Sequence, residues 1–183
     1  MAKKHPVGSH GIIPIYSDSM KYGKWYHAAP SFINLTIDPE RTNIGSMFRA
    51  LQENAAIVSG INMNKIEAFS GVDTNEVTFA AGASKGELWP QIVADVLGKV
   101  VKIPVEKEAT SLGGAMYVGV ATGEFSSLDE AKELVKIERI IEPNTQNTKL
   151  YQEIKEQWQA VYDEQLKLVD RGLSTSMWKA PGV

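Results

Sequence analysis

Cysteine is absent from this chain of 183 residues. Its absence excludes disulfides, thiolate nucleophiles and cysteine metal sites, and it fits a reducing compartment. Histidine is scarce as well: His5, His10 and His27 lie far apart in the sequence, and no H-E-x-x-H pattern accompanies them. The sequence therefore predicts no metal site made of protein ligands.

Long apolar runs are also missing. The basic pair Lys3 and Lys4 has no apolar segment behind it, so neither a signal peptide nor a membrane span is predicted. The formal net charge is −3 and the basic residues are scattered, which argues against nucleic-acid binding. We expect a cytoplasmic protein with neither a membrane nor a nucleic acid as partner.

The composition is that of a globular chain, with 43% hydrophobic and 22% charged residues. We expect one domain over residues 1–183. The sequence predicts strands near residues 11–17 and 31–36, a helix over residues 43–61 that Thr42 caps, and a short helix over 127–135. A linker at 143–147 then leads to a long amphipathic helix over 149–171, whose aromatic stripe is typical of a core.

The central window contains a strand, a tight loop, a helix, a strand and a second helix. Alternation predicts a strand at 76–80, helical spacing predicts a helix from Leu88 to Gly98, and a β-rich run predicts a strand at 99–105. The small residues in the expected helix 111–122 allow close packing. The loop between the first strand and helix has so little side-chain bulk that a flat ring could lie against its backbone, although such turns more often serve packing. Neither GxxxxGK[ST] nor GxGxxG is present.

The order of residues across this window resembles the FGGY family of carbohydrate kinases. The blocks that carry the resemblance are 79–84 (Phe-Ala-Ala-Gly-Ala-Ser), 88–96 (Leu-Trp-Pro-Gln-Ile-Val-Ala-Asp-Val) and 108–115 (Glu-Ala-Thr-Ser-Leu-Gly-Gly-Ala). Further blocks at 8–14, 25–32, 48–56 and 174–182 extend it over essentially the whole chain. The resemblance implies an α/β, ribonuclease H-like fold: the C-terminal lobe of a two-lobed, actin-like ATPase, incomplete at its N-terminus.

The same resemblance implies where a nucleotide binds. It places adenine or ribose against Gly82, Ala83, Ser84 and Gly86, whereas Lys85 is a weaker candidate for a phosphate contact. Many relatives have two successive glycines where this chain has Ala81 and Gly82, which implies a slightly narrower pocket.

No catalytic residue is predicted within the chain. Asp18, Asp38 and Asp73 could in principle deprotonate a hydroxyl, but each lies in turn-like sequence, where Asp is common for backbone reasons. The resemblance places the catalytic base in a Gly-Asp motif upstream of this segment, and the phosphate loop lies in the N-terminal lobe. We therefore expect the isolated chain to be inactive.

The resemblance thus predicts the C-terminal part of a kinase that uses ATP and Mg²⁺ to phosphorylate a hydroxyl of a small sugar-like substrate. An alternative is a non-catalytic binding or assembly module, or a separately encoded half that complements an N-terminal lobe. If the first strands of the lobe's sheet are missing, an unpaired edge should favour a homo-oligomer.

Overall fold

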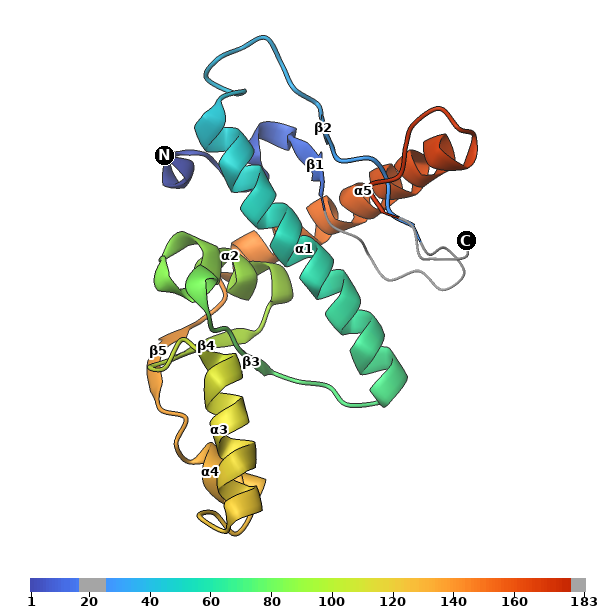
Figure 1. Cartoon of the computed structure of the whole chain (residues 1–183). Helices are drawn as coiled ribbons and strands as arrows, with labels where there is room; N and C mark the ends of the chain where they lie inside the picture. The colour runs from blue at the N-terminus through green and yellow to red at the C-terminus, as the bar shows by residue number, and fades with distance from the viewer. Residues whose placement is uncertain (17–25, 179–183) are drawn as a thin grey trace.

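The computed structural model describes residues 1–16 and 26–178 (Figure 1). Its α-helices are α1 (Ile44–Ser70), α2 (Leu88–Leu97), α3 (Ala109–Thr122), α4 (Leu128–Lys132) and α5 (Thr145–Asp170). Its strands are β1 (Ile13–Ile15), β2 (Ser31–Ile33), β3 (Glu76–Thr78), β4 (Val100–Pro104) and β5 (Ile137–Ile141). Three short 3-10 turns are η1 (Ala2–Lys4), η2 (Ser9–Gly11) and η3 (Gly82–Lys85). The mixed α/β class expected from the sequence is confirmed.

The larger sheet has the order β3-β4-β5. β3 runs parallel to β4, with Val77 opposite Val101, and β5 runs antiparallel to β4, with Ile140 opposite Lys102. Parallel strands need a crossover connection, which η3 and α2 supply here. The predicted order of strand, tight loop, helix and strand is therefore confirmed, whereas β5 is absent from the prediction. β1 and β2 form a separate antiparallel pair.

Helix α1 starts and ends with local hydrogen bonds. The Asn43 side chain accepts from the backbone N–H groups of Gly45 and Ser46, and the Ser46 hydroxyl accepts from the Asn43 N–H. The predicted cap, Thr42, is wrong, because its hydroxyl accepts instead from the Thr36 N–H at 2.9 Å. The helix continues to Ser70 rather than Ile61, and Gly71 ends it in a left-handed conformation.

Of the one apolar stripe that the sequence predicts along α1, only the last two members are buried. Its members, in chain order, are Ile44, Met47, Phe48, Leu51, Ala55, Val58 and Ile61. Ile44 and Phe48 are 79% and 54% exposed, whereas Arg49 and Glu53 are 7% and 3% exposed. The carboxylate of Glu53 accepts hydrogen bonds from a set of polar groups that surround it: Gly8 N at 3.1 Å, Ser9 Oγ at 2.7 Å, Arg49 Nε at 2.9 Å and Tyr151 Oη at 2.8 Å. These partners allow charged groups to be buried without being left unsatisfied.

This polar cluster, defined by Gly8, Ser9, Arg49, Glu53 and Tyr151, joins the N-terminal turn, α1 and α5. Burial, aided by the charge on Glu53, raises the pKa of Tyr151 above its ordinary value. Burial works against the charge on Arg49, but Glu53 outweighs it and raises the pKa of the guanidinium. The cluster therefore keeps a neutral phenol beside a charged guanidinium at neutral pH.

Helix α5 begins at Thr145, inside the predicted linker 143–147, and ends at Asp170. The boundary differs because Asn144 caps the helix, accepting from the N–H groups of Gln146 and Asn147. The buried Asp95 of α2 fixes this start, since it accepts from the Asn144 N–H at 2.8 Å and from the Asn147 amide at 2.8 Å. The predicted stripe is confirmed: Tyr151, Trp158, Tyr162 and Leu166 are all buried.

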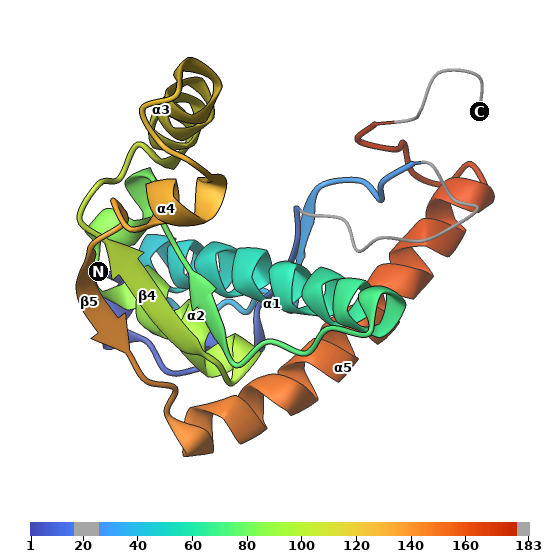
Figure 2. The same cartoon turned by 90° about the horizontal axis from the view of Figure 1, so that it is seen from below.

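Helices α3 and α4 project away from α1 and α5 (Figure 2). Met116 is the one buried residue of α3, and Tyr117 and Val118 are 67% and 62% exposed. The small residues of this helix, which allow close packing, are half-buried or exposed in the described part of the chain. A Cβ added at Gly113 or Gly114 would meet no atom within 4 Å. Among the glycines of α3, only Gly119 faces a close neighbour, the Phe125 ring, at 2.6 Å from such a Cβ.

Strand β3 is an edge strand, and β4 is its only strand partner among the residues that the structure describes. It is short, spanning 3 residues, with Glu76 and Thr78 exposed. No described helix is both long and apolar enough to cross a membrane.

Candidate functional site

The loop between β3 and α2 is built on an unusual backbone. Ala81 has φ 64° and ψ −167°, a region that glycine occupies freely and other residues rarely occupy. Its N–H donates to the carbonyl of Lys107 at 2.9 Å, so the segment after β4 holds it in place. Its own carbonyl accepts from the N–H of Ser84 at 3.1 Å and from the Ser84 hydroxyl at 2.7 Å. These bonds close the η3 turn.

Strand β5 supports the same loop from the other side. The Arg139 guanidinium donates to the carbonyl of Ser84 at 2.7 Å and to that of Gly86 at 3.4 Å. Because a guanidinium presents several donors in a rigid fork, one side chain can hold two carbonyls of the same loop. Sequence reasoning missed Arg139, since it lies on a strand that the periodicity did not reveal.

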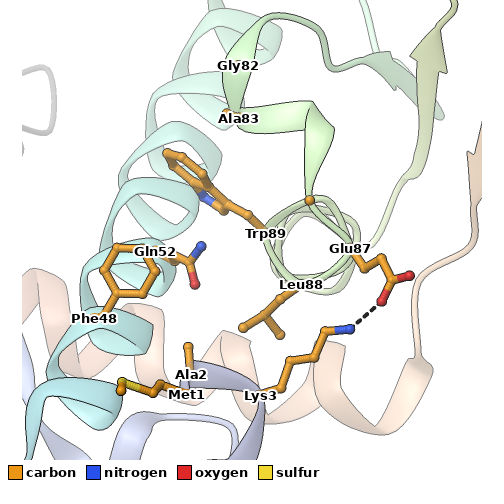
Figure 3. Close-up of a pocket in the computed structure, with 11 residues that line it drawn as sticks. Met1, Ala2, Lys3, Phe48, Gln52, Gly82, Ala83, Glu87, Leu88 and Trp89 are labelled. Atoms are coloured by element: carbon orange, nitrogen blue, oxygen red, sulfur yellow. Dashed lines mark hydrogen bonds and ion pairs between the residues drawn. The ribbon is translucent and has the colours of Figure 1, made fainter.

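An open pocket of about 680 Å³ lies against this loop (Figure 3). The residues that line it come from η1, α1, the loop and the start of α2: Met1, Ala2, Lys3, Phe48, Gln52, Gly82, Ala83, Gly86, Glu87, Leu88 and Trp89. Its size lies within the usual range for small-molecule sites. A Cβ added at Gly82 or Gly86 would meet nothing within 4 Å, so the backbone is open to the pocket at both positions.

The walls of the pocket are mostly apolar and aromatic. The Trp89 ring is held edge-on by Phe79, with their ring centroids 6.2 Å apart. Lys3 and Glu87 form an ion pair at the rim, and the hydrogen bond from Lys3 holds the pKa of Glu87 below its usual value. An apolar pocket with few polar groups and an open backbone suits a flat ring, as glycines permit close approach.

The residues that the sequence singles out for binding do not all face this pocket. Gly82, Ala83 and Gly86 line it. Ser84 is 0% exposed, and its hydroxyl stays within the turn. Lys85 is exposed and lies outside the pocket lining. Ala81 also lies outside the lining, so it does not narrow the pocket and acts through its strained backbone.

The other candidates have local roles or fall outside the described residues. Asp38 accepts from the Glu40 N–H within a turn, Asp73 lies 3.5 Å from the Lys99 ammonium, and Asp18 lies outside the described residues. The imidazoles of His5 and His10 do meet, Nδ1 to Nε2, at 3.3 Å. Residues 1–16 and 26–178 contain no group of three or more side chains of the His, Cys, Asp or Glu type that could hold a metal ion.

Ala81→Gly is expected to stabilise the chain. The strained backbone at Ala81 costs about 1–3 kcal/mol, and glycine removes this cost. Glycine also gives the unfolded chain more conformational entropy, which offsets about 0.5–1 kcal/mol of the gain. Urea unfolding should therefore show a gain of about 1 kcal/mol. The control Ala115→Gly, at an exposed position of α3, should lose about 1 kcal/mol. Equal losses at both positions would contradict the assignment of strain to Ala81.

Comparison with known proteins identifies the architecture. Residues 2–122 match the C-terminal domain of the FGGY family of carbohydrate kinases. Among solved structures, the fold is similar to a xylulose kinase from Lactobacillus acidophilus, with a TM-score of 0.74 and 17% identity over 89% of this chain and 33% of that one. It is also similar to a Plasmodium falciparum glycerol kinase with ADP, with a TM-score of 0.68 and 20% identity over 86% of this chain and 31% of that one.

Curated relatives agree with these structures. Autoinducer-2 kinase from Salmonella paratyphi A is 56% identical over 100% of this chain, and that from Yersinia pestis is also 56% identical over the same share. The blocks at 8–14, 25–32, 48–56 and 174–182 predict a resemblance to autoinducer-2 kinase in particular, and this identity confirms that prediction. The chain spans 35% of the length of these relatives. The predicted resemblance to the C-terminal part of this family is confirmed, and the chain belongs to the FGGY family of carbohydrate kinases, as part of its C-terminal domain.

Proposed function

We propose that this chain is the nucleotide-binding part of an ATP-dependent carbohydrate kinase that phosphorylates a hydroxyl of a small, sugar-like substrate. The relatives that match this chain along its whole length are named autoinducer-2 kinases, so the proposed substrate is of the autoinducer-2 type, a quorum-sensing signal. The observation that carries the proposal is the open pocket against the loop after β3. A binding or assembly module without a kinase role has no such support from the relatives.

In this proposal the pocket receives the adenine and ribose of ATP or ADP. Gly82, Ala83 and Gly86 supply an open backbone surface, and Trp89 supplies an apolar wall. Ser84 acts indirectly, because its hydroxyl and carbonyl fix the turn that shapes this surface. The nucleotide is therefore held by shape and apolar contact at the base end.

Mg²⁺ belongs to the proposed reaction because it neutralises charge on the transferring phosphoryl group. The described residues contain no cluster that fits a Mg²⁺ site, so no step is assigned to the metal here. Nor does a described aspartate lie free in the pocket to serve as base. We assign the base and the phosphate loop to the N-terminal lobe of a full-length enzyme, so the purified chain alone should not phosphorylate a sugar-like substrate.

Complementation tests this assignment of roles to the two lobes. The chain is mixed with a polypeptide that covers the remaining N-terminal part of the Salmonella autoinducer-2 kinase, and ATP-dependent phosphorylation of autoinducer-2 is measured. The proposal predicts activity in the mixture and none in either part. Activity of the chain alone would contradict the assignment of the base to the other lobe. A mixture that forms a complex without activity would contradict the kinase role.

The proposed partners include that N-terminal lobe and, without it, a second copy of this chain. Strand β3 exposes one hydrogen-bonding edge, and Tyr117 and Val118 of α3 expose apolar surface. Sedimentation velocity should therefore show self-association that rises with concentration, and the exposed-face variant Val118→Glu should weaken it. A monomer at every concentration for both proteins would contradict this prediction.

One domain and a cytoplasmic location are also part of the proposal. We treat residues 1–183 as one domain, because the core joins residues from Ile13 in β1 to Leu166 in α5. We also propose the cytoplasm as the compartment, since the proposed reaction draws on ATP.

A further inference from the structure

The polar interior of the pocket is a single side chain, Gln52. It lies one helical turn after Phe48 on α1, so both side chains face the pocket. Figure 3 shows its amide reaching from α1 toward α2, near Leu88 and Trp89. The other polar side chains of the lining are Lys3 and Glu87, which are paired with each other at the rim.

The Oε1 atom of the Gln52 amide has no hydrogen-bond partner among the described residues. It is buried in the ligand-free chain, so a ligand meets it only when the amide turns into the pocket. Buried polar atoms are nearly always paired, and an orphan one costs stability. An orphan amide in the wall of an apolar pocket is explained if a ligand supplies the missing partner.

We propose that Gln52 reads the base of the nucleotide and selects adenine over 6-oxo purines. This inference rests on the proposed function, which places the base against Gly82 and Ala83. A glutamine amide offers one acceptor and one donor side by side. Adenine offers the complement along one edge, where its 6-amino group donates and N7 accepts, whereas a 6-oxo purine presents two acceptors there.

In this proposal the loop side of the pocket binds any purine ring, and the Gln52 side selects adenine. The ring is held by apolar contacts and by the open backbone of the loop, which every purine satisfies equally. Only the amide distinguishes the substituent at C6. Gln52 is thus a specificity-determining residue, and it does not touch the reacting phosphate.

The experiment is a calorimetric titration of the chain with ADP and with inosine diphosphate, its 6-oxo counterpart. A bidentate pair discriminates strongly between bases, so we expect the unmodified chain to prefer ADP by about tenfold. Gln52→Leu should weaken ADP binding by about tenfold and change inosine diphosphate binding less than about twofold. Removing the orphan amide should not lower the urea midpoint, which checks that the variant folds.

A matched control and a second variant separate the possible outcomes. Gln157→Leu, at an exposed position of α5, should leave both affinities unchanged. Gly82→Trp should abolish binding of both nucleotides. If Gly82→Trp abolishes binding but Gln52→Leu keeps the preference for ADP, the role of Gln52 is overturned while the nucleotide site stands. If Gly82→Trp leaves ADP binding intact, or the unmodified chain binds neither nucleotide, the proposed function fails and the inference fails with it.

Discussion

Replacing Glu53 with alanine is expected to lower the free energy of unfolding by about 3–5 kcal/mol. The carboxylate is 3% exposed and accepts from Gly8, Ser9, Arg49 and Tyr151. Its removal leaves the Arg49 guanidinium buried without its counter-charge, which costs more than the net worth of the pair. Urea unfolding followed by circular dichroism measures the loss.

Two further variants separate charge from position. Glu53→Gln keeps the size of the side chain but cannot neutralise Arg49, so most of the loss should remain. Glu153→Gln, at an exposed position of α5, should change stability by no more than about 0.5 kcal/mol. A loss below about 1 kcal/mol for Glu53→Ala would mean that the polar cluster does not hold the N-terminal turn on α1.

Trp158→Ala is expected to have a comparable effect, about 3–5 kcal/mol. The indole is 2% exposed, and it stacks on Tyr162 with ring centroids 4.9 Å apart. Its Nε1–H donates to the carbonyl of Pro14 at 2.9 Å, which joins α5 to β1. The variant therefore opens a cavity and leaves a buried carbonyl unpaired.

The phenylalanine variant isolates the hydrogen bond from the packing. Trp158→Phe keeps an aromatic ring but removes the donor, so it should lose less than the alanine variant and more than a surface substitution. Phe69→Ala is the control, because Phe69 is 88% exposed on α1 and should contribute at most about 0.5 kcal/mol. If Trp158→Ala and Phe69→Ala lose similar amounts, α5 is not packed through Trp158.

Local signals in the sequence predict the central unit well. Leu88 starts α2, and Gly98 ends it in a left-handed conformation, as glycine at that position indicates. The aromatic stripe of α5 is buried because its spacing matches the helical period over many residues. The loop residues Gly82, Ala83 and Gly86 lie together in one pocket because they belong to one short turn.

Tertiary contacts decide what the sequence does not reveal. β5 has an irregular pattern in which Ile137 and Ile140 are exposed, so periodicity gives no strand signal, and pairing with β4 forms it. Arg139 reaches the η3 loop only because that pairing brings the two together. The burial of Arg49 and Glu53 likewise depends on Ser9 and Tyr151, which lie far away in the sequence.

The measurement that tests the central claim most directly is calorimetric titration of the chain with ADP, beside Gly82→Trp and the control Gly114→Trp. A Cβ atom added at either glycine meets no atom within 4 Å, so both variants should fold, but only the first places its side chain at the pocket. We predict that the unmodified chain and Gly114→Trp bind ADP and that Gly82→Trp does not. ADP binding by Gly82→Trp with the affinity of the unmodified chain would contradict a nucleotide site at this loop.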